Sequence, residues 1–360
     1  MNHLMDQTLI VMRMDFNKNK TQIINNSKSK KGVCHMAKAI KKTPKTNDEK
    51  IGNFAKFFNA RVIAYAKDNN KMPWQRGWDT VNTAWMNHVS ATTTKAYKYF
   101  LNQIILTMSA EENGYKSNKW ITKGQILKHK GASFKGSATW IFGWFYWEKV
   151  QTDKNGKVLK DKDGNDVVKS GYNFTQYMVF NTDQCTGLPE NLASDEVIED
   201  VADYVPLEGR LDHVEKYISN IGAKVEFGKN GAYYRPSTDT IGMPDFESFH
   251  SVELYYSTFM HEHIHWTKTE DRCKRKNNHA NRKAYAFEEL VAEMGAVYTM
   301  NNLGVPMDEK AFDNHLAYVD NWLGALEKDP KFLVDASMLA DKSVKFLDSL
   351  QNKEDIKKVA

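Results

Sequence analysis

Residues 260–266 read Met-His-Glu-His-Ile-His-Trp and contain the pattern His261-Glu262-x-x-His265. Positions i and i+4 lie on one face of a helix, so His261 and His265 can present both imidazoles to one ion. Glu262 lies about 100° around that helix, where it can take a proton from a zinc-bound water without binding the ion itself. The pattern predicts a helix that carries a catalytic Zn2+ site with Glu262 as its general base. A surface helix with solvated histidines is the alternative, and the additional His263 leaves it open.

A catalytic zinc ion has three protein ligands and an open fourth position, so a third ligand is needed. Residues 287–294 read Phe-Glu-Glu-Leu-Val-Ala-Glu-Met, and their apolar members recur at helical spacing. Acids beside such a buried face are costly unless they are paired or bound to a metal. We therefore predict Glu289 as the carboxylate ligand and Glu293, one turn later, as the partner of a ligand histidine or the alternative ligand. Two solvated helix acids are the other interpretation.

Short strands are expected upstream of the histidines, where residues 232–236 read Ala-Tyr-Tyr-Arg-Pro. An exposed strand edge there could hold an extended peptide through backbone hydrogen bonds. Tyr233 or Tyr234 could then donate a hydrogen bond to an oxyanion. Half-buried strand residues without a catalytic role are the alternative for both tyrosines.

The rest of the second half predicts a mainly helical region with a small sheet. A helix is expected over 211–221, and two long helices are expected between residues 249 and 303, where proline is absent and glycine is rare. Amphipathic helices are expected within 308–350. The short strands are predicted at 224–227, 232–236 and 240–243.

The first half predicts helices and strands in mixed order, which makes the whole chain α+β. The expected helices begin after Thr46-Asn47-Asp48, near Tyr99 and, in a short form opened by Trp120-Ile121-Thr122, near 123–130. The expected strands are 139–147 and 172–181, separated by a charged, hairpin-like excursion over 151–171. We assign Trp140, Trp144 and Phe145 of the first strand to the core.

Aromatic and basic residues interleave before this strand, as in proteins that stack bases on rings and bind phosphates with lysines. The residues that we select as DNA contacts are Trp74, Arg76, Lys95, Tyr97, Lys98, Tyr99, Trp120 and Lys123. Core positions are the alternative for the aromatic members, and the sequence does not decide between the two.

Composition excludes several classes of protein. Hydrophobic residues make up 41% and charged residues 26% of the 360 residues, an ordinary globular balance. No apolar run approaches the roughly 20 residues of a membrane helix, and the early run Leu9–Met12 is too short for a signal-peptide core. The three cysteines are far apart and odd in number, which favours a reducing cytoplasm over a disulfide framework. We expect a cytoplasmic protein without a membrane partner.

The net charge of +5 is unevenly distributed. Residues 1–46 hold ten Lys or Arg against two Asp, a net charge of +8, so the remainder carries −3. This leader is predicted to be disordered, as a solvated tail, as sequence ahead of a start at Met36, or as an arm that attracts nucleic-acid phosphates. The predicted organisation is a leader over 1–46, a first domain over 47–190, an acidic linker over 191–210 and a second domain over 211–350.

Short motifs occur in order through both domains. In the first they are Pro73-Trp74, Trp78, Thr94–Tyr97 with Asn102, Trp120–Thr122 with Gln125, Phe180-Asn181 with Gln184, and Gly187–Pro189. In the second they are Ala232–Tyr234, Asp239 with Ile241 and Pro244, Phe249, His261–Thr267, Arg272, Glu288–Glu293 and Asn321–Leu323. Together they resemble ArdC-type antirestriction proteins, whose N-terminal domain also occurs on plasmid primases of the TraC type. Lys98-Tyr99-Phe100 stands where that family has a glycine-rich turn.

This resemblance implies an N-terminal domain that binds single-stranded DNA and a C-terminal zincin-like metallopeptidase domain. It implies a role on a plasmid or phage, guarding incoming single-stranded DNA and blunting host restriction. Two alternatives stay open. One is a zinc endopeptidase that acts on a protein or peptide substrate, and the other is a catalytically silent zinc domain that serves DNA protection alone.

Overall fold

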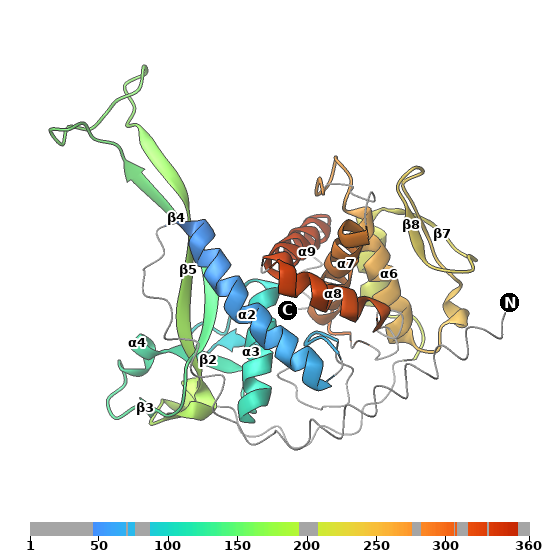
Figure 1. The fold of residues 1–360 in the computed structure, drawn as a ribbon, viewed down its shortest axis with the longest axis horizontal. Coiled ribbons are helices and arrows are strands. Elements are labelled where there is room, and N and C mark those ends of the chain that lie inside the picture. The colour runs from blue at the N-terminus through green and yellow to red at the C-terminus, as the bar shows by residue number, and fades with distance from the viewer. Residues whose placement is uncertain are drawn as a thin grey trace. The chain divides into compact units, whose positions relative to one another are not determined.

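The computed structural model describes residues 46–69, 71–75, 87–193, 208–275, 282–305, 307, 316–329 and 331–351. Residues 47–360 form one compact unit. The predicted leader up to residue 45, and residues 194–207 of the predicted linker, lie outside the described residues. The described elements are α-helices and small β-sheets, so the predicted α+β class is confirmed (Figure 1).

A four-stranded sheet organises the first half. Its strand order is β1-β2-β5-β4, with β1 and β2 parallel and the other pairs antiparallel. The strands are β1 (Val89–Ser90), β2 (Lys119–Thr122), β4 (Thr139–Val150) and β5 (Val168–Asn181), and β3 (Ser133–Phe134) pairs separately with β6 (Cys185–Thr186). The helices are α2 (Asn47–Asn69), α3 (Phe100–Asn113) and α4 (Lys123–Ile126).

The segment Trp120–Thr122 forms the end of strand β2, and the predicted short helix follows it as α4, ending at Ile126 instead of near residue 130. Trp120 packs in the main core and Ile121 in a second small cluster with Phe180. Two adjacent apolar residues that point to opposite faces are typical of a strand buried on both sides. Thr122 then caps the short helix α4 through a capping box with Gln125.

Strands β4 and β5 are longer than predicted, and they pair without interruption from Thr139↔Val179 to Val150↔Val168. Helix α2 covers part of this hairpin, since Phe54 lies 5.0 Å from Phe142 and 5.7 Å from Phe174 between ring centroids. The assignment of Trp140 and Phe145 to the core is wrong, because they are 43% and 53% exposed. Trp144 is half-buried and packs against the core.

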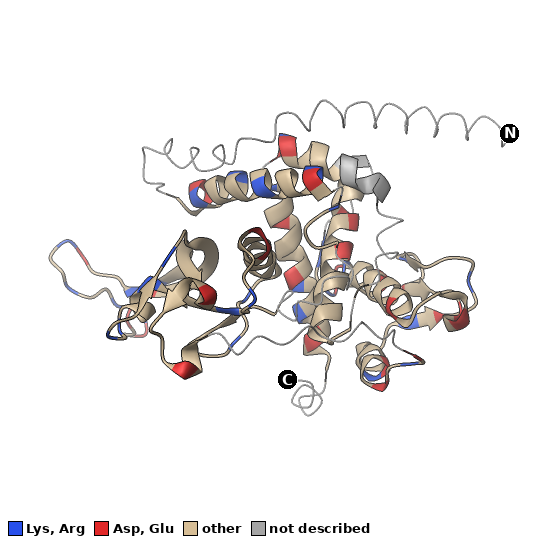
Figure 2. Ribbon diagram, turned by 90° about the horizontal axis from the view of Figure 1, so that it is seen from below, with Lys and Arg blue, Asp and Glu red and all other residues tan. Residues whose placement is uncertain are grey.

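The second half is mainly helical around a three-stranded sheet, as predicted. The strands β7 (Lys224–Glu226), β9 (Thr240–Gly242) and β8 (Tyr233–Arg235) lie in that order. The helices are α5 (Asp212–Ile221), α6 (Val252–Trp266), α7 (Arg282–Asn302), α8 (Leu316–Lys328) and α9 (Phe332–Ser349). None of the helices in the described ranges combines the length and apolar character that crossing a bilayer demands. Acidic and basic residues are interspersed along these helices (Figure 2).

One contiguous core joins residues from both halves of the chain. The rings of Phe100 on α3 and Tyr298 on α7 lie 5.3 Å apart between centroids. The Asn59 side chain on α2 donates to the backbone oxygen of Leu326 on α8, at 3.4 Å. The predicted domain boundary at 191–210 stays a prediction, but the helices of the second half pack directly on those of the first.

A side chain from the second half of the chain caps the N-terminus of helix α3. Tyr99, before its first residue, has φ of 74°, a conformation that favours glycine, at the site of the missing glycine-rich turn. Its own side chain does not cap the helix. Instead, Oδ1 of Asp341 on α9 accepts the backbone N–H of Phe100 at 3.0 Å. Asp341 is only 2% exposed, and burial raises its pKa to about 6.

This buried carboxyl group makes the stability depend on pH. Between its ordinary pKa and about 6, the folded protein binds more protons at Asp341 than the unfolded chain does, so this contribution to stability falls as pH rises through that window. Asp341→Asn keeps an oxygen that accepts the backbone N–H of Phe100 but cannot titrate. We expect the variant to lose this pH dependence of the unfolding free energy, which is about 3 kcal/mol at most. Urea unfolding of both proteins at pH 4.5 and 7.5 measures it. An equal difference between the two proteins at both pH values would contradict the assignment.

Candidate metal centre

Helix α6 carries both histidines of the sequence motif. Ser251 caps its first turn by accepting the backbone N–H of Leu254 at 3.1 Å. From there the helix runs unbroken to Trp266, which places His261 and His265 one turn apart. The Nε2 atoms of the two imidazoles lie 3.1 Å from each other. Glu262, between them in sequence, is buried beside the pair.

Helix α7 supplies the carboxylates, and it lies unusually close to α6. A Cβ atom at Gly295 would stand 2.8 Å from Cδ1 and Cγ1 of Ile264. Ile264 is fully buried and immediately precedes His265, so that contact leaves no room for a larger residue than glycine. Because glycine has no side chain, α7 lies close enough to α6 for its acids to reach the histidines.

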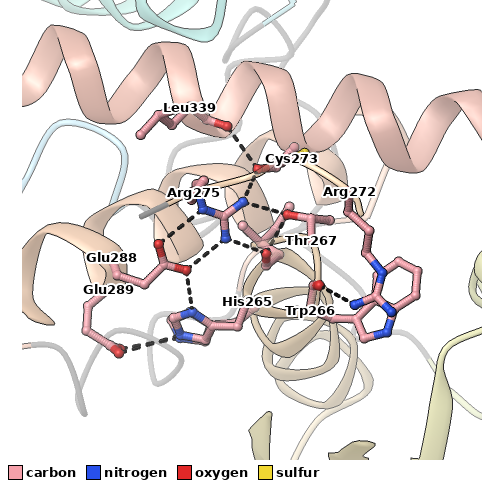
Figure 3. A network of polar contacts seen from close by, with 12 residues as sticks. His265, Trp266, Thr267, Arg272, Cys273, Arg275, Glu288, Glu289 and Leu339 are labelled. Atoms are coloured by element: carbon pink, nitrogen blue, oxygen red, sulfur yellow. Dashed lines mark hydrogen bonds and ion pairs between the residues drawn. The ribbon is translucent and has the colours of Figure 1, made fainter. Parts of the chain in front are cut away.

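Glu289 completes a cluster of three ligand atoms that all lie within 4.8 Å of one another. Its Oε2 is 3.5 Å from Nε2 of His261. Its Oε1 is 3.5 Å from Nε2 of His265 (Figure 3). The structure thus brings together the three residues predicted as metal ligands.

These distances fit a tetrahedral divalent ion. With metal–nitrogen and metal–oxygen bonds of roughly 2.0–2.2 Å, two ligand atoms of a tetrahedral zinc ion are about 3.3–3.6 Å apart. Both distances from Glu289 to the imidazoles, 3.5 Å, lie within that range, and the 3.1 Å between the two Nε2 atoms is slightly below it. Two imidazoles and one carboxylate are also the donor set of several catalytic zinc sites, which keep a fourth position open.

Glu288 has a role that the sequence analysis did not assign. Its Oε1 accepts a hydrogen bond from Nδ1 of His265 at 3.0 Å, which leaves the Nε2 lone pair of His265 directed toward the ligand cluster. Arg275 holds Glu288 in turn, with Nη2 2.8 Å from Oε1 and Nε 3.1 Å from Oε2 (Figure 3).

Arg275 is itself fixed by partners on three sides. Its side chain is 2% exposed. Its Nη1 donates to the hydroxyls of Thr267 and Ser343, both at 2.6 Å, and its Nη2 donates to the backbone oxygen of Ile264 at 2.7 Å. All of its donors are therefore used within the protein, and Glu288 is positioned as a rigid partner of His265.

The electrostatics of the cluster favour charged acids and a cation. Burial would raise the pKa of Glu288, but hydrogen bonds from His265 and Arg275 lower it to about 2. Burial likewise opposes ionisation of Glu289, whereas His261 and His265 lower its pKa to about 2. Burial would lower the pKa of His261, but Glu289 and Glu262 raise it above the ordinary value. A divalent cation would compete with this proton, because ligand histidines must be neutral.

Glu293 contacts the first half of the chain, and it also lies near enough to a ligand histidine for its charge to raise the pKa of His261, so its predicted role as partner of a ligand histidine stays a prediction. Its Oε1 accepts hydrogen bonds from Nε1 of Trp74 at 2.9 Å and Nε2 of Gln75 at 2.8 Å, all in buried surroundings. The partner of His265 is Glu288, and the carboxylate in the ligand cluster is Glu289. Glu289 and Glu293 share a face of α7 and differ in position along its axis, and Glu293 lies at the level of Trp74 and Gln75.

The two candidate oxyanion donors are used differently. The Tyr234 hydroxyl donates to Oδ1 of Asp239 at 2.9 Å, and Arg272 pairs with the same carboxylate. The ring of Tyr233 covers Gly242 on the neighbouring strand and lies under the guanidinium of Arg235. These contacts make both tyrosines part of the small sheet, and donation to an oxyanion stays a prediction.

The DNA contacts predicted for the first half divide into buried and exposed residues. Trp74 and Trp120 are fully buried, so their rings cannot stack on bases, and the prediction is corrected for them. The Tyr97 hydroxyl donates to the backbone oxygen of Trp120, and Tyr99 packs against the core. The exposed members are Lys95, Lys98 and Lys123, and Arg76 lies outside the described residues.

Comparison with known proteins identifies both halves. A family described as the N-terminal domain of anti-restriction factor ArdC matches residues 52–180, and one described as a zincin-like metallopeptidase matches residues 212–339. DNA primase TraC of Escherichia coli is 31% identical over 298 residues, which are 78% of this chain and 26% of the primase. This chain therefore spans about a quarter of that relative. An uncharacterised protein of Sinorhizobium fredii is 25% identical over 86% of this chain and 95% of its own length.

Solved structures agree with these matches. The metal-free crystal structure of the antirestriction protein ArdC from plasmid R388 has a TM-score of 0.63 and 28% identity, over 82% of this chain and 97% of that protein. The Mn(II)-bound structure of the same protein has a TM-score of 0.61 and 27% identity.

The position of Glu288 generates a prediction about metal affinity. Glu288→Gln keeps the shape of the side chain but removes the negative charge beside His265 and Arg275. We expect the affinity for Zn2+ to fall by about 10- to 100-fold, as for other partners of ligand histidines. Competition with a fluorescent chelator measures it, and Glu327→Gln, an exposed change on α8, is the control. Equal affinity in the Glu288 variant and the control would contradict this role.

Proposed function

We propose, from the premise that this chain is an ArdC-type protein, that it acts in antirestriction by binding single-stranded DNA and carrying a zinc-dependent hydrolytic site. The zincin-like half would act on a protein or peptide substrate. We place this activity in the cytoplasm of a cell that receives a plasmid or phage, where single-stranded DNA enters.

The observation that carries the hydrolytic part is the convergence of His261, His265 and Glu289 at tetrahedral spacing, with Glu262 beside them. A structural zinc site usually has four protein ligands, whereas three ligands leave a place for water or substrate. Among the described residues, three metal-ligating side chains converge in this cluster. The donor set therefore favours catalysis over a purely structural role.

The residues of the site divide the chemistry among them. A bound zinc ion would supply a Lewis acid and lower the pKa of water toward about 7. Glu262 accepts a proton from the attacking water and returns it to the leaving amine nitrogen. Glu288 and Arg275 keep the Nε2 lone pair of His265 directed at the site, and burial of the cluster limits competing water.

The DNA-binding part rests on the ArdC N-terminal domain and on exposed lysines in the first half. Lys95, Lys98 and Lys123 are exposed and can contact phosphates. Each phosphate contact to a single strand contributes about 0.7 to the slope of log affinity against log salt. We expect oligodeoxythymidine binding, followed by fluorescence anisotropy, to weaken steeply between low and high salt. Affinity that stays constant over that range would exclude phosphate-driven binding.

Two variants separate metal binding from catalysis. We expect His261→Ala to abolish stoichiometric zinc, because it removes one of three ligands. Glu262→Gln should retain zinc and lose hydrolysis of a casein probe by at least about 100-fold, as expected for loss of a general base. Elemental analysis and a fluorogenic protease assay measure the two properties. His250→Ala, an exposed histidine outside the cluster, is the matched control.

The pattern of results distinguishes the open alternatives. Zinc in the unmodified protein without cleavage of any peptide would replace the hydrolytic proposal by a silent zinc domain. Full antirestriction activity in Glu262→Gln would show that hydrolysis is not needed for protection. Absence of zinc from the unmodified protein would overturn the metal site itself.

A further inference from the structure

The hairpin of β4 and β5 has one face with an unusual composition. The strands pair residue by residue, so alternate side chains share a face. We call the face that contains Phe145, Trp147 and Lys149 of β4, with Lys169 and Gly171 of β5, the aromatic face. Trp147 is paired with Gly171, and Lys149 with Lys169.

Both rings on this face lie over glycines. A Cβ atom at Gly171 would stand 3.1–3.3 Å from Cζ2, Cε2 and Nε1 of Trp147. A Cβ atom at Gly143 would stand 3.1 Å from Cε2 of Phe145. The rings therefore rest close to the strand backbone where no side chain intervenes, and Phe145 remains 53% exposed. A ring supported from below in this way offers its other side as a flat surface for a base.

The charge on this face is entirely positive. Lys149 and Lys169 are exposed and stand directly opposite each other on paired strands. Like charges in that arrangement destabilise a strand pair, so an anionic partner would relieve the repulsion. Every other residue on this face between Thr139 and Lys149, or between Lys169 and Val179, is uncharged. The acid Glu148 belongs to the opposite face, where Tyr146 donates to it.

This part of the hairpin lies beyond the helix that covers its base. Asn47, the first residue of α2, bonds to the backbone of Tyr172 and Phe174, so the pairs from Trp147↔Gly171 outward extend past the end of α2 (Figure 1). Trp147, Lys149 and Lys169 are thereby left on a protruding ribbon, and Phe145 stands at the base of that ribbon on the face opposite to Phe142, which Phe54 of α2 contacts.

We infer that the aromatic face is a stacking platform for single-stranded DNA, which rests on the proposed function and gives that binding a location. Phe145 and Trp147 would each stack on a base, and Lys149 and Lys169 would contact the phosphates that follow. Proteins that bind single strands without sequence preference combine these two elements in one surface.

Substitution of the rings tests the stacking surface. We expect Phe145→Ala and Trp147→Ala each to weaken binding of fluorescein-labelled oligodeoxythymidine by about 5- to 150-fold, the range for loss of one stacked base. Tyr146→Ala is the matched control, because Tyr146 is 53% exposed on the opposite face of the same strand. It should bind within twofold of the unmodified protein. Thermal unfolding of each variant verifies that the hairpin is intact.

Substitution of the lysines tests the phosphate contacts. The double variant Lys149→Ala/Lys169→Ala should reduce the slope of log affinity against log salt by about 1.4, since each lost contact removes about 0.7. Lys56→Ala/Lys328→Ala changes the net charge equally at exposed positions on α2 and α8, and its slope should stay unchanged.

The outcomes separate this inference from the proposed function. If the unmodified protein binds oligodeoxythymidine but the ring and lysine variants bind as well as their controls do, the platform is refuted while DNA binding stands. An equal loss in Tyr146→Ala and Phe145→Ala also refutes the platform, because the effect would not be specific to one face. If the unmodified protein does not bind, both the platform and the proposed DNA binding fail.

Discussion

The close packing of α6 against α7 is the constraint on which the candidate site depends. Gly295 on α7 has no side chain, so Ile264 on α6 packs directly against its backbone and the two helices lie close together. This close packing brings Glu289 to His261 and His265. Buried carboxylates would be costly there without partners. Arg275 and the imidazoles provide those partners, so the network that orients His265 also makes the buried acids tolerable. A divalent ion would add the positive charge that two ionised glutamates favour.

The same helices connect the site to the first half of the chain. Glu293 follows Glu289 by one turn and is held by Trp74 and Gln75. Asp341 on α9 caps α3 through Phe100. Glu293 and Asp341 are both buried, so loss of either contact would remove a hydrogen bond from a buried carboxyl group, at a cost of about 1–3 kcal/mol. The candidate ligand cluster and the half that matches the ArdC N-terminal domain therefore share one packed framework.

The distribution of aromatic residues follows from this framework. Trp74 and Trp120 were predicted to stack on bases, but both are buried in the core. Trp74 donates to Glu293 of the second half, and Trp120 lies within the four-stranded sheet. Phe145, which looked like a core residue, lies on the face of the hairpin opposite to Phe142, the residue that α2 contacts, and is 53% exposed. A long two-stranded ribbon has no core of its own to bury such rings. Their exposure therefore calls for an explanation outside the stability of the fold, and a nucleic-acid strand fits the adjoining lysines.

Much of this protein could be predicted from sequence, because helical spacing and turn residues act locally. The amphipathic helices, the short strands and the pair His261 and His265 all follow from the order of neighbouring residues. The choice among Glu288, Glu289 and Glu293 could not be made that way, since it depends on the rotation of α7 against α6 and on how far the two helices are shifted along their axes, both of which arise from packing such as that of Gly295 on Ile264. Burial of an aromatic ring is equally non-local: it depends on which distant element covers it. The residue types and their spacing thus determined the kind of chemistry available, and packing between distant segments decided which side chains perform it.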